Sequence, residues 1–297
     1  MKSVTRMDWR VSLHGGHSGP YCDHGSGELR DFLERAVELG FSAYGLTDHA
    51  PRLGEQYLYD KERGLGWDVA RLERNFEAYA KESAILVREF ADRLTVLRGF
   101  EAEVVPSDRY VDLMLDYRKR YDFEYMVGSV HYVDDVSIDG EVRDFERALA
   151  TQGGLENLAI RYYQILTEMV DRLRPEVVGH LDLIRKRSGP YGPVDTPAIR
   201  DAAEKALEAI SRCGAILDVN TAGYRKGLDT PYPAPWLVRR AWESGIGLCM
   251  GDDSHSPDDV GLDMDLGRAY LLELDVTEVT ILTRAHGTLV QRRVPLS

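Results

Sequence analysis

Histidine is the residue that most constrains this chain, because seven of its eight histidines stand in short motifs beside glycine or aspartate. Most of these motifs come directly after a hydrophobic run that reads as a β-strand, and only His286 falls outside the pattern. Imidazole is the commonest ligand for zinc, iron and related ions in proteins. The shared context therefore predicts one metal site assembled from the whole chain by His14, His17, His24, His49, His131, His180 and His255.

Acidic residues accompany these histidines and strengthen the prediction. A single histidine at the end of a strand is more often a hydrogen-bonded structural residue than a metal ligand. Here Asp48, Glu101, Asp182 and Asp253 stand in or beside the strand-end motifs, and carboxylate oxygens complete mixed nitrogen and oxygen coordination of divalent metals. A common metal site explains this repeated context better than seven separate structural roles.

The composition is that of a globular protein with a sizeable core and an excess of negative charge. The chain has 297 residues, 43% of them hydrophobic, and a formal net charge of −13, which argues against nucleic acid or an anionic membrane as the main partner. No apolar run reaches membrane-spanning length, and the stretch MKSVTRMDWR is predicted not to be a signal peptide. Three cysteines without disulfide spacing predict reduced thiols and a cytoplasmic protein: Cys22, Cys213 and Cys249.

Strand-like and helix-like segments alternate along the chain. Amphipathic helices are predicted at 27–40, 67–93 and 197–212, and the basic segment 118–121 is expected to be the solvated end of another. Seven hydrophobic segments read as strands with polar residues at their C-terminal ends: 9–13, 42–47, 95–105, 125–133, 176–184, 215–223 and 246–255.

Seven β/α units predict an α/β fold with a parallel barrel, because loops at the C-terminal rim of such a barrel gather residues from every strand. An open doubly wound sheet collects its site at one switch point, and fits less well because the candidate ligands come from nearly every strand. No linker or repeat divides the chain, so residues 1–297 are expected to form one domain. The Gly/Pro-rich segment 188–197 is expected to lie over the site, and 289–296 to form an edge strand.

The motifs resemble those of the PHP (polymerase and histidinol phosphatase) superfamily, most closely its monofunctional histidinol-phosphate phosphatase branch. The resemblance runs from SLHGGHS to GDDSHSPDDVG and implies a distorted (β/α)7 barrel with three divalent metal ions at the C-terminal rim of the strands. The family's first motif is a His-x-His pair, which is one residue longer here. The later matching motifs are TDH at 47–49, GFE at 99–101, GSVH at 128–131, GHLD at 179–182 and DDSH at 252–255.

The resemblance also implies a set of ligands. Glu101 would bridge two ions, while Glu103 would lie outside the ligand set and Asp252 would support it. Mixed nitrogen and oxygen ligation suits zinc, iron or manganese, and Cys22 is expected to fill space rather than to ligate. By position, the first ion would bind His14, His17, Glu101 and Asp253, the second Glu101, His131 and His180, and the third His24, His49 and His255.

Phosphate recognition requires positive, donor-rich groups, which arginine supplies in a bidentate arrangement. Arg185 in GHLDLIRK and Arg225 in NTAGYRK follow motif strands and resemble positions at which this branch binds phosphate. Arg52 is a weaker candidate for the same role. Asn220, at the end of its strand, is a candidate contact to substrate.

The resemblance implies a metal-dependent phosphomonoesterase that hydrolyses L-histidinol phosphate, a small anionic ester, in histidine biosynthesis. A hydroxide bridging two metal ions would attack phosphorus, and Glu101, Asp253 and His255 would form the catalytic set. The acid that protonates the leaving oxygen stays unassigned, with Asp48 and Asp182 as candidates.

Three alternatives stay open. The substrate could be another small phosphate ester or a nucleotide, because motifs made of metal ligands report the reaction better than the leaving group. A PHP module without catalysis is disfavoured by the nearly complete ligand set. A metal-dependent amidohydrolase on a related barrel is disfavoured because no lysine stands in the motifs.

Overall fold

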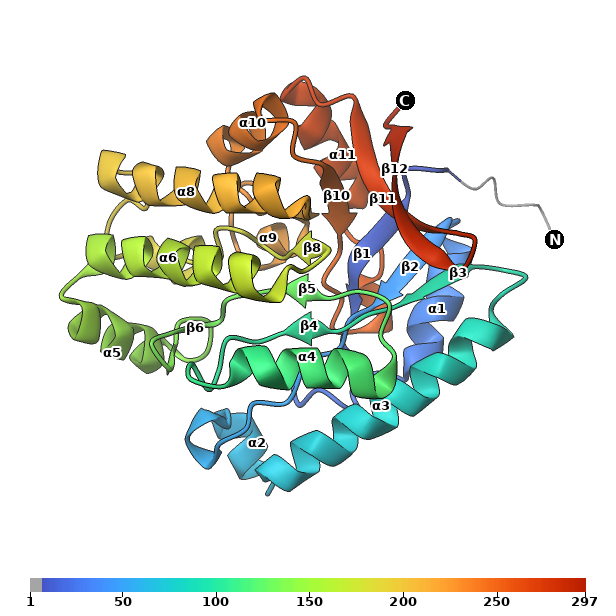
Figure 1. The fold of residues 1–297 in the computed structure, drawn as a ribbon, viewed down its shortest axis with the longest axis horizontal. Helices are drawn as coiled ribbons and strands as arrows, with labels where there is room; N and C mark the ends of the chain where they lie inside the picture. Colours follow the sequence, from blue (N-terminus) through green and yellow to red (C-terminus); the bar gives the residue numbers. More distant parts are fainter. Residues whose placement is uncertain (1–6) are drawn as a thin grey trace.

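Seven strand positions and their intervening helices follow one another in chain order around a shared core (Figure 1). The computed structural model describes residues 7–297, so the first six residues of the stretch predicted not to be a signal peptide lie outside the described residues. Each position coincides with one of the seven predicted strands: β1 Val11–Gly16, β2 Ala43–Leu46, β3 Thr95–Arg98 continued by β4 Glu101–Ala102, β5 Val127–Gly128, β8 Val177–Val178, β9 Ile216–Asn220 and β10 Leu248–Gly251.

The strands form two parallel ladders that adjoin at both ends. One ladder has the order β1-β2-β3 and the other β4-β5-β8-β9-β10, and a two-residue interruption joins β3 to β4. At the opposite junction β10 runs beside β1, where the backbone N–H of Asp253 donates to the His14 carbonyl at 2.8 Å and that of His17 to the Ser254 carbonyl at 2.7 Å. The fold is therefore a distorted seven-stranded (β/α) barrel, as predicted, and not an open doubly wound sheet.

Helices cover the outside of the barrel, and the three predicted from periodicity are present. Helix α8 shows why the sequence fixes its ends: the Thr196 hydroxyl accepts from the N–H of Ile199, and Gly214 ends the helix at a φ of 75°. The helices are α1 Leu29–Glu38, α2 Asp60–Gly64, α3 Val69–Glu89, α4 Tyr110–Tyr121, α5 Val142–Gln152, α6 Leu155–Leu173, α7 Arg185–Ser188, α8 Pro197–Cys213, α9 Ala222–Arg225, α10 Pro235–Glu243 and α11 Met264–Glu273, with short 3-10 turns at Glu55–Tyr57 and Pro257–Asp259.

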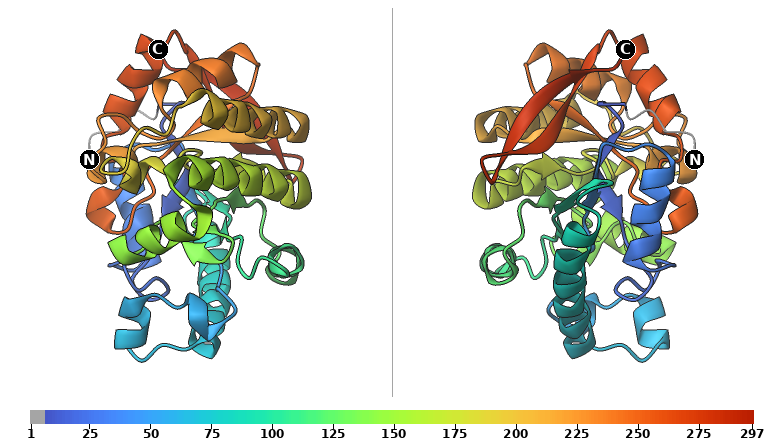
Figure 2. Two further views of the ribbon diagram at one scale, coloured as in Figure 1. Left: turned by 90° about the vertical axis from the view of Figure 1, so that its left-hand side faces the viewer. Right: turned by 90° about the vertical axis from the view of Figure 1, so that its right-hand side faces the viewer.

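The C-terminal segment lies outside the barrel sheets. Residues 289–296 were expected to form an edge strand, and β12 (Thr288–Pro295) is one, because it pairs only with β11 (Glu278–Ala285) in a separate two-stranded antiparallel sheet. His286 and Gly287 make the tight turn with φ values of 51° and 81°, which explains why this histidine stands outside the motifs. The hairpin contacts the N-terminal ends of the barrel strands, since Arg284 donates to the Val96 carbonyl and Gln291 to the Gly214 carbonyl, both at 2.7 Å (Figure 2).

The remaining elements are small. Strands β6 (Tyr132–Val133) and β7 (Val136–Ser137) form a two-residue antiparallel ladder just after β5. The basic segment 118–121 ends α4, as predicted. No helix in residues 7–297 is both long enough and apolar enough to cross a membrane.

Candidate metal centre and active site

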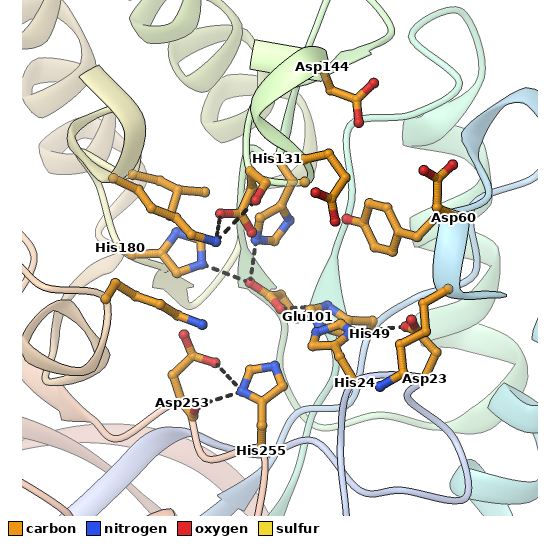
Figure 3. A pocket seen from close by; sticks show the side chains of 18 of the residues that line it. Asp23, His24, His49, Asp60, Glu101, His131, Asp144, His180, Asp253 and His255 are labelled. Carbon is orange, nitrogen blue, oxygen red and sulfur yellow. Dashed lines mark hydrogen bonds and ion pairs between the residues drawn. The ribbon is translucent and has the colours of Figure 1, made fainter. Parts of the chain in front are cut away.

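A cavity of about 260 Å³ opens at the C-terminal ends of the strands (Figure 3). Seven of the nine predicted metal ligands line it, and they lie on or just after six of the seven strand positions. The other two, His14 and His17, are fully buried beneath it. The lining ligands are His24, His49, Glu101, His131, His180, Asp253 and His255.

Glu101 is the centre of the arrangement. It is the first residue of β4 and only 1% exposed, and Figure 3 shows its carboxylate between His180, His131 and His49. Both of its oxygens are approached by imidazole nitrogens. Oε1 lies 3.1 Å from His180 Nε2, 3.4 Å from His14 Nε2 and 3.5 Å from His131 Nε2, while Oε2 lies 2.8 Å from His49 Nδ1 and 3.9 Å from His17 Nε2.

The potential ligand atoms gather into compact groups, each with its members within 4.8 Å of one another. One group is His14, His17 and Glu101, and another is Glu101, His131 and His180, so Glu101 belongs to both. Asp253 is shared in the same way, with His14 and His180 in one group and with His17 and His255 in another. The carboxylates therefore stand where neighbouring cations would be bridged.

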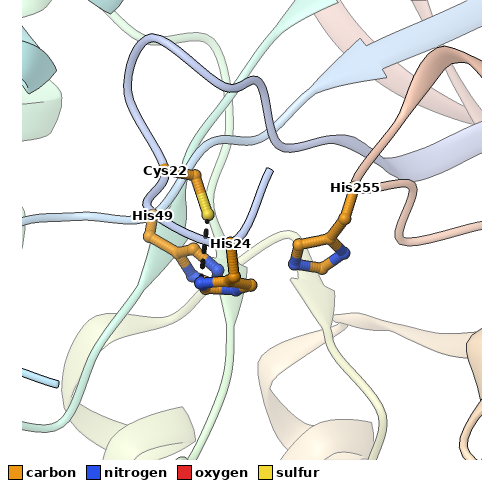
Figure 4. Close-up of side chains that lie close together, drawn as sticks. All are labelled: Cys22, His24, His49 and His255. Carbon is orange, nitrogen blue, oxygen red and sulfur yellow. Dashed lines mark hydrogen bonds between the residues drawn. The ribbon is translucent and has the colours of Figure 1, made fainter. Parts of the chain in front are cut away.

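A further group contains the three histidines expected to share one ion, and it also contains Cys22 (Figure 4). The Cys22 sulfur lies 3.3 Å from His24 Nδ1, and the other members are His49 and His255. Burial raises the pKa of the Cys22 thiol well above its usual value, so without a metal it stays protonated. The expectation that Cys22 only fills space was therefore too narrow, because its sulfur is within reach of this group.

Two carboxylates contact the Nδ1 atoms of two imidazoles and so fix which ring nitrogen faces Glu101. Asp218 lies 2.9 Å from His14 Nδ1, and Glu103 contacts His131 Nδ1, which leaves both Nε2 atoms facing Glu101. Such carboxylate partners orient metal-binding histidines and raise their basicity. Sequence reasoning missed Asp218, although an aspartate inside the hydrophobic run AILDVN was a usable signal. Glu103 lies behind His131, as expected for a residue outside the ligand set.

The extra residue in the first motif is absorbed by an irregularity in β1. Ser12 pairs with Tyr44 and Gly16 with Leu46, so residues 13–15 face the single residue Gly45 of β2. A Cβ on Gly15 would stand 2.0 Å from the Gly45 carbonyl oxygen, so only glycine fits there. This bulge turns His14 and His17 toward the same centre despite their wider spacing.

The backbone is strained at two of these residues. Asp253 has a φ of 46° and His180 a φ of 20°, although neither is glycine. Residues in such sparsely populated conformations cluster at functional sites because the surrounding structure holds them there. At Asp253 the N–H bond to the His14 carbonyl supplies part of that restraint.

The histidines fall into two classes by the direction in which their pKa is shifted. Burial lowers the pKa of His49 to about 3, reinforced by His17, and burial also lowers the pKa of His255 well below its usual value. Burial opposes the charged form of His131 too, but Glu103 and Glu101 outweigh it and raise its pKa to about 9. For Glu101, burial alone would raise the pKa, yet His14, His131 and His49 together hold it well below its usual value.

Several imidazole nitrogens at the centre are buried without a hydrogen-bond partner among the described residues. They include His14 Nε2, both nitrogens of His17, His49 Nε2 and His180 Nδ1. A buried polar atom left unpaired costs about 1–3 kcal/mol, so five in one place form a costly arrangement for the protein alone. Divalent cations would satisfy one nitrogen of each of these rings, and the mixed nitrogen, oxygen and sulfur donors fit zinc or iron chemistry.

The two arginines predicted to bind phosphate do not line the cavity. Arg185 donates to Asp182, to the Pro231 carbonyl and to the Thr230 hydroxyl. Arg225 donates to the carbonyls of Asp252 and Asp253 at 2.6 and 2.9 Å. Both guanidinium groups are thus used to hold loops of the protein.

The positive charge on the cavity wall comes from lysines instead. Two of them, Lys186 and Lys226, directly follow the two arginines in sequence, and the third is Lys61. Adjacent residues of a helix point about 100° apart, so a shift of one position decides which side chain faces the cavity. Lys186 donates to Asp139. Burial alone would raise the pKa of Asp139, but Lys186, His131 and Lys226 lower it below its usual value.

Asn220 and Arg52 also differ from their predicted roles. Asn220 is fully buried, and its amide donates to Asp218 at 3.0 Å and to Asp253 at 3.3 Å, so it positions carboxylates rather than touching substrate. Arg52 is buried against Glu62, and its guanidinium carbon lies 3.9 Å from the centroid of the Tyr59 ring. It anchors the segment that brings Tyr59 to the cavity.

The loop at 188–197 does not lie over the site. The Tyr191 ring packs 5.6 Å from that of Phe145 in α5, and its hydroxyl donates to Glu146. The cavity is bordered instead by residues 59–61, beside α2, and by 139–144, at the start of α5. Sequence reasoning missed these borders because they carry no motif.

Asp48, Asp182 and Asp252 serve as hydrogen-bond acceptors for backbone and side-chain groups of the protein. Asp48 accepts from the N–H groups of Ser18 and His49, and burial raises its pKa to about 6. Asp182 accepts from the Ala234 N–H and Asp252 from the Gly261 N–H, and burial raises both pKa values. None of the three lines the large cavity.

Known proteins are similar to this chain in sequence and in fold. The model of the PHP domain family matches residues 14–222. A probable histidinol-phosphatase of Schizosaccharomyces pombe is 32% identical, covering 95% of this chain and 93% of the relative. The histidinol-phosphatase of Bacillus subtilis is 30% identical, covering 82% and 92%. The structure of a Lactococcus lactis histidinol phosphate phosphatase complexed with zinc, L-histidinol and phosphate has the same fold, with a TM-score of 0.71 at 17% identity and coverages of 96% and 100%.

Proposed function

Because the chain belongs to the PHP domain family, we propose that it is a metal-dependent histidinol-phosphatase. It is a phosphoric monoester hydrolase that converts L-histidinol phosphate into L-histidinol and phosphate. The observation that carries the proposal is the set of histidine and carboxylate groups joined through Glu101 and Asp253 at the edge of a cavity. The relatives named histidinol-phosphatase span nearly the whole chain and supply the substrate.

The residues present suit three divalent ions, which we infer to be zinc, iron or manganese. Bound there, such ions would neutralise phosphoryl oxygens and lower the pKa of water to supply the nucleophile. The first ion would be held by His14, His17, Glu101 and Asp253, the second by Glu101, His131 and His180, and the third by His24, His49 and His255 with Cys22 within reach.

The protein's own groups complete the site around the ester. Lys226 and Lys186 place positive charge on the cavity wall for the phosphate. The border at 139–144 also carries Glu141 and Asp144, which suit the ammonium group of an amino-alcohol phosphate. A neutral sugar phosphate has no such group, so this acidic border favours histidinol phosphate over sugar esters.

Two other readings are less well supported. No lysine stands in any of the histidine- and carboxylate-bearing motifs, so the carboxylated-lysine centre of an amidohydrolase is not favoured. A PHP module without catalysis should have lost some of the nine predicted ligands, whereas all nine occur in these groups. The three cysteines are free within the described chain, in keeping with the cytoplasmic setting that we infer.

A phosphate-release assay on protein with quantified metals tests the proposal. L-histidinol phosphate is compared with a nucleotide monophosphate and a sugar phosphate at equal concentrations. We expect more than one bound ion per chain and the highest kcat/KM for histidinol phosphate. A clear preference for another ester would move the substrate within the same enzyme class. Less than one ion per chain with no phosphate release would support the non-catalytic module.

A further inference from the structure

Tyr232 is a cavity-lining residue that no metal group and no motif accounts for. It lies in the loop before α10 and is 1% exposed. Its backbone is fixed to the end of β9, because the Asn220 N–H donates to the Tyr232 carbonyl at 2.8 Å and the Tyr232 N–H donates back at 3.0 Å. Its ring centroid lies 6.1 Å from that of His180. The side chain is therefore held in one place, next to the metal-binding end of the cavity.

The Tyr232 hydroxyl has no hydrogen-bond partner among the described residues. Of the residues that line the cavity, three have a buried polar atom in this condition: His49, His180 and Tyr232. Both histidines belong to the metal-binding groups. The phenol is outside those groups, and burying an unpaired hydroxyl is unfavourable. The structure thus leaves one oriented donor without an acceptor in the site.

We propose that Tyr232 donates a hydrogen bond to a phosphoryl oxygen of the bound ester. The inference rests on the proposed function in taking a phosphate ester as the ligand. A phenol in a buried site donates well to an anionic oxygen, and such charge-assisted bonds are about twice as strong as neutral ones. The neighbouring side chains favour this acceptor, because the Tyr232 ring lies beside His180, which belongs to two of the metal-binding groups.

The test compares Tyr232→Phe with Tyr117→Phe. Tyr117, in α4, also has a buried hydroxyl without a partner, but it packs against Phe76, 5.1 Å between ring centroids, and does not line the cavity. Each variant removes one unpaired hydroxyl, so neither should lower the Tm of the phosphate-free holoenzyme by more than about 2 °C. Both should keep the wild-type metal content.

Inorganic phosphate is the principal probe, used as a competitive inhibitor and as a stabiliser in thermal unfolding. We expect Tyr232→Phe to raise the inhibition constant of phosphate about 10-fold or more and to lower kcat/KM for L-histidinol phosphate by about 10- to 100-fold. Tyr117→Phe should match the wild type in both. The Tm increase that phosphate gives the wild type should shrink only in Tyr232→Phe.

The outcomes separate this inference from the proposed function. If histidinol phosphate is not hydrolysed but phosphate still stabilises the wild type more than Tyr232→Phe, the role of Tyr232 stands and the substrate is wrong. An unchanged inhibition constant in Tyr232→Phe would overturn the inference while leaving the function intact. Loss of metal ions from Tyr232→Phe would also overturn it, because the phenol would then support the metals. Absence of phosphate binding by the wild type would overturn both.

Discussion

Replacing Glu101 with glutamine is the sharpest test of the metal centre. The substitution keeps the shape of the side chain and removes the charge that faces five imidazoles at 2.8–3.9 Å. Glu101 is 1% exposed, so water cannot take its place. Because it belongs to two of the ligand groups, its loss weakens two metal positions at once.

The structure sets the scale of the expected effect. A glutamine amide presents one oxygen and one NH2 group, so one of the two positions now held by an oxygen would face a donor that cannot bind a cation. We expect at least one metal ion per chain to be lost and kcat to fall by about 10²–10³ or more, the range for removal of a major electrostatic element. KM should change much less than kcat.

Glu103→Gln is the matched control, because Glu103 stands two residues away and is equally buried. Glu103 contacts only the outer nitrogen of His131, so its replacement should reduce metal affinity about 10- to 100-fold while activity is largely retained at saturating metal. Metal content by elemental analysis and steady-state phosphate release are measured on both variants. A fully metallated and active Glu101→Gln protein would refute the assignment, as would a Glu103→Gln variant more damaged than Glu101→Gln.

Three further predictions concern other parts of the site. His14→Ala should lower both metal content and kcat, measured together on one preparation, and full metallation of the active variant would mean that His14 is not a ligand. Lys226→Ala should raise the KM for histidinol phosphate about 10-fold at unchanged metal content. Arg225→Ala should also lose metal, because Arg225 holds the carbonyls of Asp252 and Asp253. Kinetics with elemental analysis separate the two variants, and an unchanged metal content in Arg225→Ala would contradict its supporting role. For Asp48, burial raises the pKa from 3.8 to about 6, so its contribution to stability is fully present below about pH 3 and is lost as the pH rises through about 6. Urea unfolding of the metal-free proteins should show the wild type losing about 2 kcal/mol more than Asp48→Asn between pH 4 and pH 6. Parallel pH profiles of the two proteins would contradict this.

The barrel and the ligand groups were predictable because parallel strands that follow one another along the chain bring their C-terminal ends together. The motif residues were placed at the ends of seven hydrophobic segments, and parallel strands in a barrel all end at one rim. His14 and His255 are far apart in sequence, yet the junction of β1 with β10 brings their segments together. The wider spacing of the first motif did not disturb this, because the bulge at Gly15 compensates for it.

The sequence did not indicate which basic side chains line the cavity, for a reason that is equally physical. Arg185 begins α7 and Arg225 ends α9, and both helices have only four residues. A helix this short has no amphipathic pattern from which to read its inner face, so the sequence cannot distinguish Arg185 from Lys186 or Arg225 from Lys226. The borders at 59–61 and 139–144 were missed because loop positions depend on packing, such as that of Arg52 and Glu62.

One of the supporting carboxylates, Asp218, could have been predicted from the sequence. Asp218 stands in the middle of β9, where every residue is buried, and a buried charge is tolerated only when it is paired. An aspartate inside such a strand therefore predicts a partner from another strand of the barrel, and His14 on β1, beyond β10, is that partner at 2.9 Å. Asn220, two residues later on the same face of the strand, extends the network to Asp253. The alternate residues of β9 thus hold ligands from both ends of the chain, so Asp218→Asn should disturb His14 before it disturbs the fold.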